Sequence, residues 1–234
     1  MSSNTLSTTG NQDIKEIKIA NIENEIHEES QCAETEMPVE VEKKTGVSFP
    51  IKLHDGRELK AIGVRRKNVF GFPFKIYSFG IYADNQKLAA VLKSKLVERQ
   101  AKVTKEMYEM VIDNPVGITV KMVMVISNVP MSMVRKNLND GIGVAIRKLG
   151  GGQNNELTKR IMGEAKDEIK LTHGSKIEVT CLPGYVLETK ANGKVVNKLE
   201  SELVCRAFVY LYLGEDPLDK EAKDKFGMSL VSMF

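Results

Sequence analysis

The sequence predicts an α+β fold built on an antiparallel sheet. Segments with strand-like alternation gather in two groups, residues 45–84 and 175–199, while helical segments lie between and after them. Strands and helices that cluster, rather than alternate strictly, are typical of α+β domains with antiparallel sheets. Pro-Gly and Asn-Gly dipeptides separate the short strand-like runs of the second group, and both dipeptides are strong hairpin signals.

The first 44 residues differ in composition from the rest of the chain. They carry ten acidic and four basic side chains, a net charge of −6, and no aromatic residue. A stretch of this kind buries too little apolar surface to fold alone, so we expect residues 1–44 to form an acidic, largely disordered leader. Subtraction from 34 basic and 31 acidic side chains leaves 30 basic and 21 acidic for the domain 45–234, a net of +9. A basic domain favours anionic partners without selecting one.

Composition also argues against several classes of protein. The longest apolar run, around residues 122–127, is far too short for a membrane span, so we expect no stable membrane insertion. Cys32, Cys181 and Cys205 are widely spaced and odd in number, which suits free thiols better than a disulfide framework. The three histidines do not have the spacing of a zinc site or a catalytic triad, and we expect no metal or cofactor. Nucleic acid is not expected either, because the chain shows no nucleic-acid-binding motif and has no tryptophan.

The first group of strands follows the leader directly. "GVSFPIKL" (46–53) and "ELKAIGVRRK" (58–67) predict a hairpin, with Asp55 and Gly56 supplying its turn. "FKIYSFGIYAD" (74–84) predicts the next strand after a turn rich in glycine and phenylalanine.

Helices and one more strand follow. Residues 86–96 and 104–112 predict short helices, because their apolar residues recur three and four positions apart. "VGITVKMVMVIS" (116–127) predicts a strand. Residues 130–149 predict an amphipathic helix, and its apolar face consists of Met131, Val134, Leu138, Ile142, Ala145 and Leu149.

The glycine-rich stretch "LGGGQNNE" (149–156) raises the possibility of a phosphate-binding loop. It lacks the lysine and hydroxyl residue of a P-loop, and it follows a helix rather than a strand. A linker between helices is therefore the favoured interpretation, with a charged helix over 154–169.

The last part of the chain predicts strands and then two helices. The strands are expected at residues 175–182, 185–190 and 194–199. The apolar segment 199–213 predicts a buried helix that ends at Gly214, a residue type suited to a C-terminal cap. Asp216 as N-cap and Pro217 in the first turn predict a final helix through about Phe226.

Arg65 and Tyr77 are the two polar side chains that core packing does not explain in the first group of strands. Alternation places Arg65 on one face of its strand with Leu59, Ala61 and Gly63, and the small residues among them would leave room above that face. It places Tyr77 on one face of the next strand with Phe79, Ile81 and Ala83. If the strands pair, the guanidinium and the phenol can converge. Arg65 would then pair with an internal carboxylate, extend to solvent, or anchor a ligand carboxylate with Tyr77 as a further donor.

Four methionines add a second observation. Met122, Met124, Met131 and Met133 could line an adaptable lipid cavity, because the methionine side chain conforms to irregular apolar shapes. Ordinary core packing is the competing explanation and the commoner one.

Several stretches resemble the chalcone isomerase superfamily, most closely its plant fatty-acid-binding branch. They are "TGVSFP", "GVRRK", "FKIYSFGIYAD", the amphipathic segment 130–149 and "ANGKVVNKLESELVCRAFVYLYLGEDPLDKEAKDKF", and together they span about Thr45 to Phe226. The resemblance implies an open-faced sandwich, in which a layer of helices covers a large antiparallel sheet and a smaller sheet lies beside it. It also implies a cleft between the sheet and the helices.

The resemblance implies a set of site residues as well. In the isomerases the arginine of "GVR" holds the anionic substrate, which corresponds to Arg65. Tyr77 falls where the isomerases carry a threonine that orders a catalytic water, and a tyrosine is the replacement in the fatty-acid-binding branch. A tyrosine and an asparagine of the enzymes fall near Met131 and Leu138, and an enzyme serine or threonine is matched by Ser201. Apolar residues at two of these places remove donors that the reaction needs.

The sequence therefore favours a non-catalytic binder of free medium- or long-chain fatty acids, supporting fatty acid metabolism. Arg65 and Tyr77 would hold the carboxylate, with Met131, Leu138 and Ser201 as further ligand-binding residues. Two alternatives stay open: an enzyme that isomerises a chalcone-like compound, and a non-catalytic partner of flavonoid or fatty-acid pathway enzymes. The resemblance implies the chloroplast stroma. The cytosol is the alternative, because the leader has no arginine and many glutamates, unlike a transit peptide.

Overall fold

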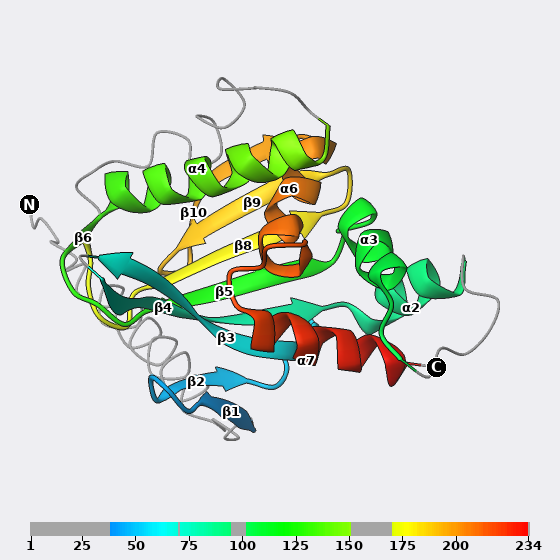
Figure 1. Ribbon diagram of the computed structural model, residues 1–234, viewed down its shortest axis with the longest axis horizontal. Helices are drawn as coiled ribbons and strands as arrows, with labels where there is room; N and C mark the ends of the chain where they lie inside the picture. Colours follow the sequence, from blue (N-terminus) through cyan, green and yellow to red (C-terminus); the bar gives the residue numbers. More distant parts are fainter. Residues whose placement is uncertain (1–37, 70, 95–101, 151–169, 234) are drawn as a thin grey trace, which may run out of the picture. The chain divides into compact units, whose positions relative to one another are not determined.

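The computed structural model describes residues 38–69, 71–94, 102–150 and 170–233. Its centre is a six-stranded antiparallel sheet in the order β10-β9-β8-β5-β4-β3 (Figure 1). The six strands are β3 (Glu58–Val69), β4 (Phe72–Ala83), β5 (Ile118–Met124), β8 (Lys176–Leu182), β9 (Val186–Ala191) and β10 (Lys194–Glu200). Two small antiparallel sheets pair β1 (Val39–Glu42) with β2 (Val47–Pro50), and β6 (Val129–Pro130) with β7 (Lys170–Leu171). This is the α+β architecture that the sequence predicts.

The described ranges contain five helices, and most begin at a side-chain cap. They are α2 (Asn85–Lys93), α3 (Lys105–Asp113), α4 (Met131–Lys148), α6 (Glu202–Leu213) and α7 (Lys220–Val231). Asp84, Thr104, Ser201 and Asp219 accept hydrogen bonds from the first backbone N–H groups of α2, α3, α6 and α7. Such caps satisfy donors that a helix leaves unpaired at its start. None of these helices is both long and apolar enough to cross a membrane.

The main core lies between the large sheet and the helices. Figure 1 shows α4 and α6 crossing one face of the sheet. Phe79, Ile81 and Met122 from that face pack with Phe208 of α6 and Phe226 of α7 in one buried cluster. A smaller cluster on the other face joins Phe49 of β2 to Ile62 and Val123. The sheet is thus covered mainly on one side, as the open-faced sandwich expected from the sequence requires.

The predicted hairpin between 46–53 and 58–67 forms only next to its turn. Gly56 makes the turn, with φ +86° and a hydrogen bond from its N–H to the carbonyl of Leu53. Antiparallel pairing continues only through the bridge between Lys52 and Glu58 and the flanking hydrogen bonds, because β2 pairs with β1 and β3 pairs with β4. Strand β1 lies within the segment that the sequence assigns to the leader. Residues 1–37 and the expected linker and helix at 151–169 lie outside the described residues.

The start of the last helix also differs from the prediction. The N-cap of α7 is Asp219 rather than Asp216, and the helix continues beyond Phe226 to Val231. Asp219 has two functions here: one carboxylate oxygen accepts from the N–H of Ala222 at 3.1 Å, and the other accepts from the N–H of Val64 at 3.0 Å. The same residue therefore begins α7 and attaches it to β3.

Close packing at Gly63 explains how α7 approaches β3. A Cβ atom on Gly63 would lie 2.7 Å from the ring of Phe79 and 2.8 Å from the Cβ of Ala222. The space above this glycine is therefore filled by protein, and it is not the room for a ligand that the sequence suggests. The prediction that Leu59 shares the face of Arg65 is also wrong: the register shifts between Leu59 and Ala61, and Leu59 packs on the opposite face.

Candidate functional site

The pairing of β3 with β4 places Arg65 directly opposite Tyr77. A second register shift follows at once, because Arg66 pairs with Lys75 and leaves Ile76 as the extra residue of a bulge. Bulges redirect side chains, and here the consecutive residues Ile76 and Tyr77 both line the same cavity. The guanidinium and the phenol thus lie on one side of the sheet, as neighbours across two strands.

Both side chains face a cavity of about 540 Å³ between the sheet and α4. This volume lies within the range of roughly 300–1,000 Å³ that is usual for small-molecule sites. Its apolar lining comes from four strands, α4, α6 and two connecting segments, and consists of Phe74, Ile76, Met122, Met124, Ile126, Val129, Met133, Val134, Leu138, Ile177, Leu211 and Leu218. An apolar cavity with a few polar groups is the usual form of a ligand site.

Arg65 has no ionic partner among the described residues. None of the ion pairs or side-chain hydrogen bonds between residues 38–69, 71–94, 102–150 and 170–233 involves its guanidinium. Arg57 and Arg206, in contrast, each pair with an aspartate. A half-buried guanidinium without a carboxylate keeps its donors available, and its planar fork matches a ligand carboxylate in bidentate geometry.

Tyr212 of α6 completes a group of three polar side chains with Arg65 and Tyr77, and the sequence reading missed it. Burial raises the pKa of Tyr77, while a hydrogen bond from Tyr212 and the positive charge of Arg65 act in the opposite direction. Burial also raises the pKa of Tyr212 well above its usual value, and the neighbouring Tyr77 raises it further. The two phenols therefore interact, since each influences the pKa of the other. Both phenols therefore stay protonated at neutral pH.

The hydroxyl of Tyr77 can serve a ligand as a hydrogen-bond donor. A phenol carries one O–H, and burial keeps that proton on Tyr77 because it raises the pKa of the side chain. Tyr212 itself does not line the cavity, and its hydroxyl donates to the sulfur of Met122 at 3.8 Å. The signal that could have found it is the segment "AFVYLYL", where a buried helix carries two tyrosines at alternate positions.

Of the other predicted site residues, Leu138 lines the cavity, whereas Met131 and Ser201 do not. Met131 is completely buried in the core at the start of α4. Ser201 lies at the other end of α6 from the cavity lining, where its hydroxyl accepts from the N–H of Val204 at 3.3 Å. Leu211, ten residues further along the chain, is the residue through which α6 reaches the cavity.

Three of the four methionines considered in the sequence do line the cavity: Met122, Met124 and Met133. Met122 and Met124 are also almost inaccessible to solvent, whereas Met133 is 52% exposed. Core packing and cavity lining are thus combined in one stripe of β5. The fourth, Met131, belongs to the core alone.

Polar residues occupy the outer rim of the cavity. Lys67 of β3 donates to the side-chain oxygen of Asn137 on α4 at 2.9 Å, which links the sheet to the helix across the rim. Lys136 and Asp140 of α4 also belong to the lining. The polar groups thus fall into two sets, an inner one around Arg65 and an outer one on the rim.

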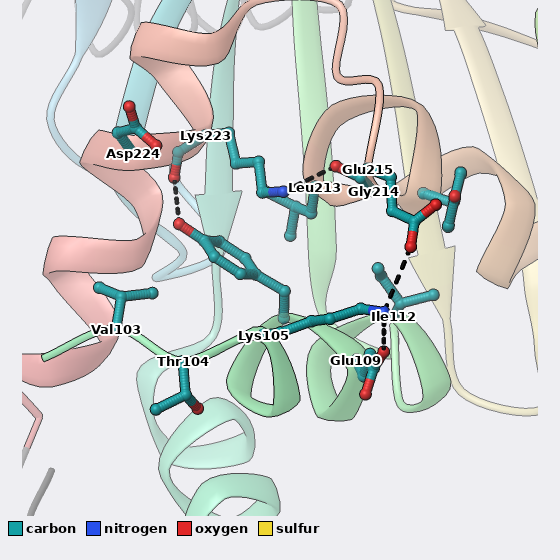
Figure 2. A pocket seen from close by; sticks show the side chains of 12 residues that line it. Val103, Thr104, Lys105, Glu109, Ile112, Leu213, Gly214, Glu215, Lys223 and Asp224 are labelled. Carbon is teal, nitrogen blue, oxygen red and sulfur yellow. Dashed lines mark hydrogen bonds and ion pairs between the residues drawn. The ribbon is translucent and has the colours of Figure 1, made fainter.

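A second cavity, of about 300 Å³, lies among α3, α6 and α7 (Figure 2). Its charged side chains already have partners. The ammonium of Lys105 lies 3.4 Å from Glu109 and 3.2 Å from Glu215, and the ammonium of Lys223 donates to the carbonyl of Gly214 at 2.7 Å. These contacts leave no unpaired cation comparable to Arg65, so the larger cavity is the better candidate site. No group of three potential metal ligands occurs in the described ranges.

The fold and the larger cavity together define an α+β protein that encloses an apolar cavity with an inner group of hydrogen-bond donors. The sequence profile of the chalcone isomerase-like family matches residues 41–226. The chain belongs to this family, and the resemblance seen in the sequence is confirmed.

Named relatives fall into two groups. The chain is 45% identical to chalcone isomerase-like protein 1 of Humulus lupulus over 208 residues, which are 88% of this chain and 97% of that protein. It is 33% identical to fatty-acid-binding protein 1 of Arabidopsis thaliana over 190 residues, 80% of this chain and 68% of that protein. The crystal structure of this Arabidopsis fatty-acid-binding protein superposes with a TM-score of 0.79 at 31% identity, covering 84% of this chain and 98% of that one.

Proposed function

We propose that this protein binds free fatty acids without catalysing a reaction on them. The single observation that carries the proposal is Arg65, a cation that has no ionic partner among the described residues, faces an apolar cavity and lies opposite a protonated tyrosine. The similarity to a protein named for fatty acid binding, in sequence and in structure, supports the same ligand class.

The geometry divides the binding energy between the two parts of the ligand. A fatty acid carboxylate would accept two hydrogen bonds from the guanidinium of Arg65 and one from the hydroxyl of Tyr77. The acyl chain would lie against Met122, Met124 and Leu211. Each buried methylene contributes about 0.8 kcal/mol before the cost of ordering the chain, so the chain supplies most of the affinity. The guanidinium selects the charged head group.

The test compares two neighbouring arginines. Laurate is titrated into delipidated native protein and into Arg65→Ala and Arg66→Ala variants, with 1-dodecanol as the uncharged control ligand. Loss of a desolvated charged partner costs about 2–4 kcal/mol, so Arg65→Ala should weaken laurate binding roughly 30- to 700-fold. Arg66 is exposed and does not line the cavity, so its variant should bind like the native protein. Equal laurate affinity in all three proteins would reject the anchor.

Isomerisation of a chalcone-like compound is the second candidate. It is favoured by the name of the Humulus lupulus relative, and Arg65 with Tyr77 could hold any apolar compound that carries a negative charge. The cavity offers few groups for that chemistry. Leu138 and Leu211 present only methyl groups, and the two phenols are kept protonated by burial, so they do not act as bases at neutral pH. Ring closure of a chalcone faster than in buffer, and lost in Arg65→Ala, would establish the enzyme instead.

A further inference from the structure

The mouth of the cavity carries an exposed apolar surface that ligand binding alone does not explain. Phe72 is 69% exposed and Phe74 is 49% exposed, both near the turn between β3 and β4. The other four phenylalanines in the described ranges are at most 1% exposed. Met133, in the first turn of α4, is 52% exposed and lines the cavity together with Phe74. Large apolar side chains gathered at one place on a surface indicate an interaction site.

Positive charge surrounds these apolar side chains. Arg66, Lys67 and Lys75 are all exposed on the same pair of strands, and no acidic residue occurs between residues 63 and 83. Lys136 adds an exposed cation from α4. Figure 1 shows the β3–β4 turn and the beginning of α4 at the same end of the sheet, and the hydrogen bond between Lys67 and Asn137 joins the two elements there. We call Arg66, Lys67, Phe72, Phe74 and Lys75 the hairpin tip.

We propose that the hairpin tip and the first turn of α4 dock on the surface of an anionic lipid membrane, with the mouth of the cavity facing the lipid. Aromatic and cationic side chains together are the composition that binds the boundary between head groups and acyl chains. Negatively charged lipids attract each lysine or arginine near the surface. A bilayer can deform around side chains that protrude from a narrow two-stranded ribbon, whereas a folded acidic protein would leave part of their apolar area in water.

The inference rests on the proposed function, because a fatty acid ligand explains why the membrane-binding surface lies beside the mouth of the cavity. A fatty acid that leaves a bilayer for water exposes its whole acyl chain, which is unfavourable for every methylene. A cavity whose mouth touches the membrane shortens that exposure. Phe74 and Met133 belong both to the cavity lining and to the exposed surface, so they would form a continuous apolar path between the two.

The first experiment is sedimentation with vesicles of phosphatidylcholine alone and of an equal mixture with phosphatidylglycerol. Native protein should sediment with the mixed vesicles and remain in solution with the neutral ones. Arg66→Glu combined with Lys75→Glu should lower the partition coefficient at least about tenfold, because it removes two cations and adds two anions at the surface. Lys93→Glu with Lys148→Glu, the same charge change at exposed sites on α2 and at the far end of α4, should change it much less.

A second pair of variants tests how much the exposed apolar side chains contribute to vesicle binding. Phe72→Ser should lower binding to mixed vesicles about tenfold or more, because the ring no longer enters the lipid. Met228→Ser, at a 61% exposed site on α7, should leave binding unchanged. The chain has no tryptophan, so Phe72→Trp introduces a single tryptophan whose emission can be excited selectively. Its emission should shift to the blue and be quenched by brominated lipids, while Met228→Trp should show neither effect.

Titration of laurate without vesicles separates this inference from the proposed function. Arg66, Phe72 and Lys75 do not line the cavity, so their variants should keep native laurate affinity while losing vesicle binding. Intact laurate binding without any vesicle binding would overturn the docking surface alone, and vesicle binding without laurate binding would refute the proposed function alone. If poly-L-glutamate displaces the vesicles and Phe72→Ser binds it as well as native protein does, the partner is an acidic polypeptide and the membrane proposal is wrong.

Discussion

Removal of the Tyr212 hydroxyl tests the polar group behind the proposed anchor. Tyr212 is buried on α6, does not line the cavity, and interacts through its hydroxyl with Tyr77. Without that hydroxyl, Tyr77 can turn its own proton away from the ligand. A neutral hydrogen bond contributes about 0.5–1.5 kcal/mol, so Tyr212→Phe should weaken laurate binding roughly 2- to 12-fold.

The assay is calorimetric titration of delipidated protein with laurate and with 1-dodecanol. Tyr77→Phe should weaken laurate binding by more than Tyr212→Phe does, because it removes the direct donor. The double variant should bind like Tyr77→Phe alone, since Tyr212 acts through Tyr77. Tyr210→Phe is the matched control on the same helix, because Tyr210 lines the second cavity.

Two results would refute this reasoning. Native laurate affinity in Tyr212→Phe would show that the hydroxyl does not orient Tyr77. Equal losses for laurate and for dodecanol would show that the substitution disturbs the packing of the cavity rather than the head-group contact. Thermal unfolding of each variant shows whether a loss of affinity merely follows a loss of stability.

Further predictions concern stability and pH. Because burial raises the pKa of Tyr77, laurate affinity should persist as pH rises through about 10, where an ordinary tyrosine ionises; a loss centred there would contradict the buried donor. Folding should respond differently, because the tyrosine ionises more readily in the unfolded chain than in the folded protein. The free energy of unfolding, measured in urea, should therefore fall as pH rises above about 10, and less steeply in Tyr77→Phe. The hydroxyl of Tyr82 is buried and has no hydrogen-bond partner among the described residues, so Tyr82→Phe should be neutral or stabilising. Tyr108→Phe, in contrast, loses a 3.0 Å hydrogen bond and should cost about 1 kcal/mol in urea unfolding. Gly63→Ala should destabilise by about 1–3 kcal/mol, while Gly141→Ala, in a helix and 3.2 Å from a flexible leucine side chain, should not.

The sequence contains enough information to predict the sheet and the pair of polar residues on β3 and β4. Arg65 and Tyr77 stand out because each interrupts an apolar alternation, and the register between β3 and β4 brings them together. Leu138 follows from helical periodicity, which places it on the inner face of α4. These predictions depend on strand alternation and helical periodicity, which are local properties of the sequence and are retained in the folded chain.

The predictions that failed depend on contacts between distant segments. A register shift inside β3 moves Leu59 to the other face, and alternation cannot reveal such a bulge. Ser201 has the right chemistry for a site, yet it lies at the start of α6, where a helix needs a cap. Tyr212 comes close to Tyr77 only because α6 packs over β4, and no spacing in the sequence predicts that contact.

The central claim is that Arg65 and Tyr77 hold a carboxylate while the acyl chain fills the apolar cavity. A crystal structure of the protein with bound laurate tests it most directly. The account predicts the carboxylate within hydrogen-bonding distance of the Arg65 guanidinium and the Tyr77 hydroxyl, with the chain along Met122 and Met124. A carboxylate bound instead at the rim beside Lys67, or a ligand in the smaller cavity, would contradict it.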